Sequence, residues 1–252
     1  MARSIALFFA LFVCVSFANE LQYGSVIDAG STGTRIWVFE WEKRESATSA
    51  SPQTTPKVVG GGGFNNGGGN PVSGIANISD CYRILGPLIN HAKNLIPGGS
   101  HSGSPIYLKA TAGMRVLNET LRQNIMSYIR QSFMNTTFNP FQFEISQAVI
   151  ASGEEEGTFG WLSVNDLSNV LFTKDGSVTY GALDLGGMST QISFAAQPSS
   201  DILAGLTALR LWDYTYRLYT YSYLRFGGNG FEAQIAQYVY DNIGSLNNPC
   251  LN

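Results

Sequence analysis

The sequence predicts an α/β fold organised around two copies of one strand–turn–strand hairpin. In the first copy, residues 26–39, apolar Val26 and Ile27 lead into a turn of small residues, and β-rich residues carry the chain away. In the second copy, residues 183–192 match residues 27–36, with the aspartate, the first glycine, a threonine and the closing isoleucine in the same places. Strands alternate with helices between the two copies, which is typical of the α/β class.

The turns of both hairpins are suited to binding phosphate. A tight turn of glycines and hydroxyl residues directs backbone N–H groups and hydroxyls at one point, where an anion binds. Asp28 and Asp184 stand at the edges of the two turns. Either copy taken alone predicts an ordinary hairpin. Because the pattern occurs twice, far apart in one chain, we expect a duplicated phosphate clamp that faces a shared cleft.

The N-terminal residues 1–18 have the pattern of a cleaved signal peptide. Arg3 precedes an apolar run over residues 5–17, and small residues lie three and one positions before the expected cut. The run is short for a membrane span, so a signal peptide is favoured over a signal anchor, and no later stretch is apolar enough to cross a bilayer. We therefore expect a secreted protein, or one in the lumen of the endoplasmic reticulum or Golgi. Three glycosylation sequons agree with this location and begin at Asn77, Asn118 and Asn135.

The charge of the chain argues against a nucleic-acid partner, and its cysteine content leaves the disulfide state open. The chain has 15 basic and 18 acidic residues, and removal of Arg3 with the signal peptide leaves 14 against 18, a net charge of −4. This mild acidity indicates no basic surface for nucleic acid. Cys14 leaves with the signal peptide, and Cys81 and Cys250 remain. In an oxidising compartment these two either form one disulfide or each lack a partner.

Apolar periodicity predicts the helices and strands around the hairpins. Helical spacing indicates one helix over residues 75–96, kinked or restarted at Pro87, and a second helix around residues 117–129. Three further elements complete the prediction: short strands at residues 106–108 and 141–145, a tyrosine-rich strand and core segment at 209–226, and a last helix at 231–240.

Residues 60–69 are rich in glycine, which invites a comparison with nucleotide-binding loops. No Gly-Lys-Ser/Thr ends the segment, and no G-x-G-x-x-G opens a helix there. We therefore expect a flexible surface loop over these residues.

Three successive glutamates begin the helix that follows Ser152. Ser152 and Glu155 have the spacing of a capping box, and acidic residues suit the first turn of a helix. These local roles account for Glu154 and Glu155. They do not require Glu156, which lies one residue beyond the box.

Four segments in this order resemble the first four apyrase signature regions of the ecto-nucleoside triphosphate diphosphohydrolases. They are residues 28–35, 110–115, 152–161 with Asn165, and 184–191. The resemblance runs from about residue 25 to residue 250 and implies the actin-like (ribonuclease H-like) two-domain fold, with nucleotide in the cleft between the domains. On this basis we expect a signal peptide at 1–18, a first actin-like domain at 19–165, and the N-terminal part of a second at 166–252.

The resemblance also implies a reaction and roles for individual residues. The reaction is divalent-metal-dependent hydrolysis of nucleoside tri- and diphosphates, in which water attacks the terminal phosphate directly. Glu156 matches the general base, and Thr111, Ser189 and Gln191 match residues around the phosphate and the attacking water. Asp28 and Asp184 match the carboxylates that hold Ca²⁺ or Mg²⁺, mostly through water. The matching phosphate-binding residues are Gly30, Ser31, Thr32, Gly33, Gly186, Gly187, Met188, Ser189 and Thr190.

The sequence departs from the family pattern mainly at its C-terminal end. Family chains continue beyond the point matched by Pro249 and Cys250, so we expect an incomplete second domain and homo-association through its open surface. No residue here is assigned to recognition of the nucleobase. Cys81 lacks the partner that the family would give it, and Arg225 stands where a cysteine is common.

Two other functions compete with the hydrolase. The first alternative is a non-catalytic truncated protein that binds phosphate or a partner without turnover. The second is a sugar or acetate kinase on the same fold. The signal peptide argues against a kinase because kinases depend on cytosolic ATP, and Glu156 near Trp161 suits attack by water.

Overall fold

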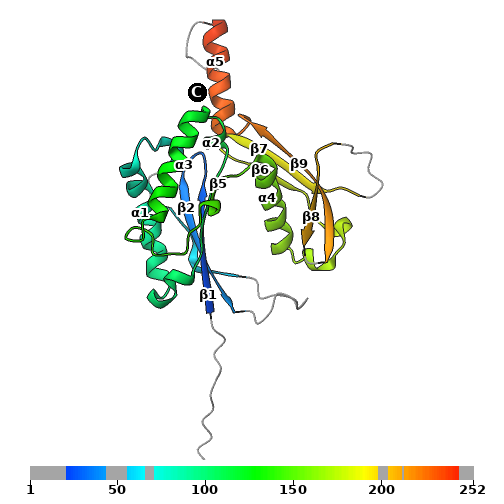
Figure 1. Cartoon of the computed structure of the whole chain (residues 1–252). Coiled ribbons are helices and arrows are strands. Elements are labelled where there is room, and N and C mark those ends of the chain that lie inside the picture. The colour runs from blue at the N-terminus through cyan, green and yellow to red at the C-terminus, as the bar shows by residue number, and fades with distance from the viewer. Residues whose placement is uncertain (1–20, 44–55, 66–70, 198–203, 212, 244–252) are drawn as a thin grey trace, which may run out of the picture.

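The computed structural model describes residues 21–43, 56–65, 71–197, 204–211 and 213–243, which form two β-sheets and five α-helices (Figure 1). The first hairpin lies in a five-stranded sheet, and the second lies in a four-stranded sheet. The α/β class and both hairpins are therefore confirmed. The expected signal peptide and Cys250 lie outside the described residues.

The first sheet has the strand order β3-β2-β1-β4-β5. Its first three strands form an antiparallel meander: β1 (Leu21–Ala29), β2 (Thr34–Glu42) and β3 (Lys57–Asn65). Next to β1 lie the parallel strands β4 (Ile106–Ala110) and β5 (Ala148–Ile150). Alternation along β1 buries Ile27 and Ala29 in the core and places Val26 and Asp28 on the opposite face.

Helices α1 (Ile78–Leu95) and α3 (Glu119–Met134) cover one face of this sheet (Figure 1). Their buried residues join those of β1, β2 and β4 in one large apolar core. The short helix α2 (Ala112–Arg115) follows β4 almost directly. Cys81 lies in the core as a free thiol, and burial raises its pKa to about 11, so this cysteine is a poor nucleophile.

The expectation of a loop in the glycine-rich segment is wrong for residues 60–65, which belong to β3. Backbone pairing with β2, which composition does not reveal, orders this part of the segment, with a register shift between Ile36 and Val38. Gly60 and Gly61 both have a φ of +81°, a conformation that glycine adopts without strain. Residues 66–69 lie outside the described residues.

Two smaller expectations also need correction. Of the two outcomes expected at Pro87, the restart is wrong: helix α1 runs through Pro87 as a single element, because the buried Leu85, Leu88 and Ile89 on either side of it hold the helix on the core. The strand expected at 141–145 is absent there, and the strand in this region is β5, which begins at Ala148. Within residues 141–145, Gln142 forms one isolated bridge and Ile145 begins the 3₁₀ turn Ile145–Gln147. Buried Phe141 gave that stretch its strand-like pattern.

The second sheet is antiparallel throughout and has the order β6-β7-β9-β8. Its strands are β6 (Ala182–Leu185), β7 (Ser189–Ala195), β8 (Leu206–Leu211) and β9 (Tyr214–Leu224). Helix α4 (Gly153–Leu167) packs on β6, β7 and β9 and lies between the two sheets (Figure 1). A small core gathers here, with Trp161 in edge contact with Tyr216.

The tyrosine-rich segment forms strands as expected, but only Tyr216 of its tyrosines is buried, while Tyr221 and Tyr223 are exposed. Helix α5 (Gly228–Ile243) confirms the expected last helix and projects away from both sheets (Figure 1). Within the described ranges, no helix combines the length and apolar character needed to cross a membrane.

Candidate active site

The two hairpin turns meet between the sheets, as the duplicated clamp requires. A Cβ added at Gly187 in the second turn would lie 2.6 Å from the Ser31 hydroxyl oxygen and 2.6 Å from the Thr32 methyl carbon in the first turn. The start of α2 also lies against the first turn, since a Cβ on Gly113 would lie 2.9 Å from the Cα of Ser31. The candidate phosphate-binding residues of both turns are therefore close neighbours.

Hydrogen bonds orient the peptides of the second turn. The carbonyl oxygens of residues 186–188 accept hydrogen bonds of 2.6–2.9 Å from N–H groups of the segment 225–230. Because the C=O and N–H of a planar trans peptide point in opposite directions, the N–H groups of residues 187–189 point away from that segment. Successive N–H groups with a shared direction make an anion-binding concavity. The hydroxyl of Thr190 is already engaged, since it donates to the Phe226 carbonyl at 2.5 Å.

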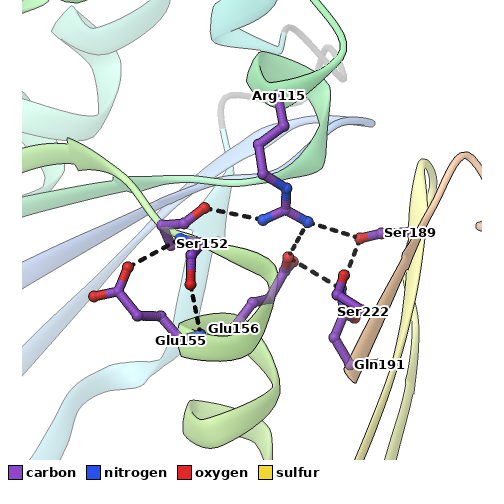
Figure 2. A network of polar contacts seen from close by, with 8 residues as sticks. Arg115, Ser152, Glu155, Glu156, Ser189, Gln191 and Ser222 are labelled. Atoms are coloured by element: carbon purple, nitrogen blue, oxygen red, sulfur yellow. Dashed lines mark hydrogen bonds and ion pairs between the residues drawn. The ribbon is translucent and has the colours of Figure 1, made fainter. Parts of the chain in front are cut away.

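Glu156 is held by a polar network that reaches from α2 to β7 (Figure 2). Its Oε2 accepts from Nη2 of Arg115 at 2.8 Å and from Nε2 of Gln191 at 3.1 Å. The Ser189 hydroxyl lies 2.7 Å from the same Gln191 nitrogen and 3.2 Å from the same Arg115 nitrogen. Ser222 on β9 adds a hydrogen bond of 2.9 Å to Gln191. Three of the four expected catalytic residues are thus joined in one hydrogen-bond network.

The local sequence separates Glu156 from its two neighbours. Ser152 and Glu155 exchange both hydrogen bonds of the expected capping box, at 3.1 Å and 2.9 Å, which keeps Glu155 at the helix end (Figure 2). Glu154 and Glu155 are exposed, whereas the Glu156 side chain is only 18% exposed. The next residue, Gly157, lets the helix approach the second sheet: a Cβ there would lie 2.5 Å from Ser193 Oγ.

Asp28, Asp184 and Glu156 make the site electronegative. Asp28 lies near the end of β1 opposite Arg35, and Asp184 lies on β6 opposite Gln191. Burial raises the pKa of Glu156, the Arg115 guanidinium opposes that effect, and the charges of Asp184 and Asp28 raise the pKa further. For Asp28, burial likewise raises the pKa, Arg35 lowers it, and Asp184 raises it.

A cavity of about 600 Å³ joins these groups to the fourth expected catalytic residue, Thr111. Thr111 stands at the N-terminal end of α2, where its N–H donates to the Ala29 carbonyl at 3.2 Å. The cavity lies between the face of β1 and β4 that carries Asp28 and the side of α4 that carries Glu156. Lys109 and Phe159 line it as well and contact each other, with the ammonium 5.8 Å from the ring centre.

The donor set fits a hard divalent cation held largely through water. Asp28 and Asp184 supply carboxylate oxygens from two separate hairpins, and their repulsion is what a cation between them would relieve. Within the described residues, no group of three or more histidine, cysteine, aspartate or glutamate side chains is arranged to enclose a metal ion. Ca²⁺ or Mg²⁺ bound here would therefore keep most of its ligands from water or phosphate.

Sequence reasoning assigned no role to two members of the network. Arg115 closes the motif 110–115, and its place in that motif is the one signal that the sequence offered for it. Ser222 lies in the tyrosine-rich strand, and no local pattern distinguishes it. Gln191, by contrast, was expected, and its Oε1 is buried with no hydrogen-bond partner in the described part of the chain.

Known proteins are similar to this chain in sequence and in fold. The chain is 36% identical to human ectonucleoside triphosphate diphosphohydrolase 3 over 247 residues, covering 91% of this chain and 44% of that protein. It is also 36% identical to human ectonucleoside triphosphate diphosphohydrolase 2 over 217 residues, covering 82% of this chain and 42% of that protein. The chain thus spans less than half the length of the curated relatives it matches.

A solved structure supports the fold. The structure of nucleoside triphosphate hydrolases from Neospora caninum matches with a TM-score of 0.65 at 17% identity, over 89% of this chain and 48% of that chain. This match confirms the two-domain actin-like fold that the sequence predicted. The model of the GDA1/CD39 (nucleoside phosphatase) family matches residues 15–252. The chain therefore belongs to the GDA1/CD39 nucleoside phosphatase family.

Proposed function

We propose that this site hydrolyses nucleoside tri- or diphosphates by direct attack of water on the terminal phosphate. The observation that carries the proposal is the convergence of Glu156 with Ser189 and Gln191 of the second hairpin, beside the carboxylates of Asp28 and Asp184. The names of the relatives point to the same substrate class. No serine or cysteine nucleophile is needed, because water is the attacking group.

The hairpins bind the phosphates in this proposal. The N–H groups of residues 187–189 bind phosphate oxygens, and residues 30–33 bind them from the first turn, with the Ser31 and Thr32 hydroxyls. The attacking water lies beside Gln191 and Ser189, which match the residues around that water in the family. Thr111 contacts the terminal phosphate from the other side of the cavity.

Glu156 acts as the general base. Its carboxylate takes a proton from the attacking water as the new P–O bond forms, and the bond to the leaving phosphate breaks. Asp28 and Asp184 would hold Ca²⁺ or Mg²⁺, mostly through water, and such an ion would supply neutralisation of the phosphate charge.

The remaining expectations concern the organisation and location of the protein. We assign residues 19–165 and 166–252 to the two domains, and residues 1–18 to a signal peptide of a protein secreted or held in the secretory pathway. Glycans are proposed on the sequon asparagines; Asn77 and Asn118 cap α1 and α3 through Oδ1, which leaves Nδ2 for the glycan. Homo-association through the second domain completes the proposal.

The test is phosphate release from ATP, ADP, GDP and UDP by the purified secreted chain. Activity is expected with Ca²⁺ or Mg²⁺ and none with a chelator. Release that survives chelation would contradict the roles of Asp28 and Asp184, and no release under any condition would favour binding without turnover.

The matched variants Glu156→Gln and Glu155→Gln sharpen this test. Glu156→Gln keeps the shape but removes the proton acceptor, so turnover should fall by about 10²–10⁴-fold. Glu155→Gln still closes the capping box and should cost at most about 1 kcal/mol of stability, with activity retained. The opposite result would place the base one residue earlier.

A further inference from the structure

The Arg115 guanidinium contacts three groups that belong to three different parts of the site (Figure 2). Nη1 donates to the Ala151 carbonyl at 3.0 Å, just before α4 begins. Nη2 lies 2.8 Å from Glu156 Oε2 on α4 and 3.2 Å from Ser189 Oγ on β7. We propose that Arg115 is the positioning residue for the general base, which it holds against the second hairpin so that Glu156 Oε1 faces the attacking water. This inference rests on the proposed hydrolysis.

Both hydrogen bonds to Glu156 fall on the same carboxylate oxygen. Arg115 and Gln191 donate to Oε2, and Oε1 accepts no hydrogen bond from any residue that the structure describes. A carboxylate held by one oxygen keeps the lone pairs of the other for a proton. The geometry therefore assigns the proton transfer to Oε1: the water proton goes to Oε1 while the water oxygen bonds to phosphorus and the leaving oxygen departs with its electron pair.

The contacts of Arg115 favour positioning over direct binding of phosphate. Both terminal nitrogens already have protein acceptors, and the side chain is only 14% exposed. Its planar fork suits several acceptors at fixed directions, which a flexible ammonium cannot match. The N–H groups of residues 187–189 remain for the phosphate instead.

The surrounding charges explain why the base needs such a partner. Glu156 shares the cavity with Asp28 and Asp184, whose negative charges repel its carboxylate. Without the guanidinium, this repulsion is no longer offset and Oε2 loses one of its two donors, so the side chain would leave its place beside Gln191. Displacement by about 1 Å of a reacting group costs up to about 10²-fold in rate.

The test compares Arg115→Met with a matched control, Arg130→Met. Arg130 on α3 also donates to a backbone carbonyl, that of Ala148, at 2.9 Å and 3.1 Å, but it has no contact with Glu156 or with the second hairpin. Arg115→Met should lower kcat by about 10–10²-fold with KM changed less than about threefold, and added guanidinium ion should restore part of kcat. Arg130→Met should leave kcat unchanged and should not respond to guanidinium.

Three results would overturn the assignment. An Arg115→Met variant with unchanged kcat would show that the base needs no positioning, while Glu156→Gln remains inactive and the proposed function stands. A loss of more than tenfold in affinity for a non-hydrolysable ATP analogue, with kcat retained, would make Arg115 a phosphate ligand. Absence of phosphate release by the unchanged chain would overturn the function and this inference together. If Arg115→Met does not fold, Arg115→Lys, assayed with and without guanidinium ion, takes its place. Lysine keeps the positive charge, but this variant should have only part of the kcat of the unchanged chain.

Discussion

At the scale of single residues, the site concentrates negative charge in a partly buried place. Asp28 and Glu156 both have a raised pKa, chiefly because burial penalises the charged carboxylate, and Asp184 adds to the effect in each case. A group whose pKa is higher in the folded than in the unfolded chain stabilises the fold only at low pH. That contribution is lost as the pH rises through the folded pKa. Near neutral pH the charged form therefore costs stability, a cost that the proposed cation would offset.

Replacement of Asp28 by Asn should reveal this cost. The amide has a similar shape but no charge, so Asp28→Asn should raise the melting temperature at pH 7 in the presence of a chelator. The advantage should vanish at a pH low enough to protonate Asp28. Added Ca²⁺ or Mg²⁺ should raise the melting temperature of the unchanged chain more than that of Asp28→Asn. Thermal melts at two pH values, with and without the ion, check both points. A lower melting temperature for Asp28→Asn in chelator would show that the ion pair with Arg35, 3.8 Å away, outweighs burial.

At the scale of secondary structure, α4 carries the base and depends on close contact with the second sheet. The capping box fixes where the helix begins, and Gly157 fixes how near it lies to β7 and β9. A Cβ at this position would lie 2.5 Å from both Ser193 Oγ and Thr220 Cγ2. Glu156 precedes this contact directly, so the distance between the base and Gln191 depends on it.

Gly157→Ala should therefore push α4 away from the sheet. We expect a loss of about 1–3 kcal/mol of stability from overpacking, together with a lower kcat because Glu156 moves away from Gln191. Gly160 on the same helix is the control for stability, since a Cβ there meets nothing within 4 Å. Gly160→Ala should be neutral or stabilise by about 0.4–1 kcal/mol. Denaturant melts and phosphate release measure both effects. Equal stability of the two variants would mean that α4 adjusts without cost.

The α4 region also shows which parts of the site the sequence could predict. Ser152 and Glu155 predict the helix start from their spacing alone, because a capping box is a local interaction. The box accounts for Glu155 and not for Glu156, whose role came from the family resemblance. Ser222 could not be found in this way, since it reaches Gln191 only through the pairing of β9 with β7. The glycine-rich part of β3 could not be predicted for the same reason, because its strand structure depends on pairing with β2 and not on its own residues.

At the scale of the whole molecule, the two sheets share the same hairpin but differ in how the first strand of that hairpin pairs. β1 pairs on both sides, with β2 and β4, whereas β6, its counterpart, pairs only with β7 in the part of the chain that the structure describes. The duplicated motif predicted the shared cleft because both turns carry the same residues. It could not predict this difference, which depends on strands far from either turn.

The open side of β6 carries the largest exposed apolar side chains of the hairpins, and we expect it to drive association. Leu183 is 80% exposed and Leu185 is 72% exposed, and the edge of β6 away from β7 pairs with no strand in the described part of the chain. Light scattering across a concentration series should show soluble oligomers. In a separate measurement, the chain should bind a hydrophobic dye. The double variant Leu183→Glu with Leu185→Glu should be monomeric at the same concentrations.

Leu167→Glu is the matched control, because Leu167 is 84% exposed on α4 but adjoins no open strand edge, and this variant should associate like the unchanged chain. A monodisperse monomer with a cooperative melt for the unchanged chain would contradict the prediction, since this apolar edge would then be stable in water without a partner.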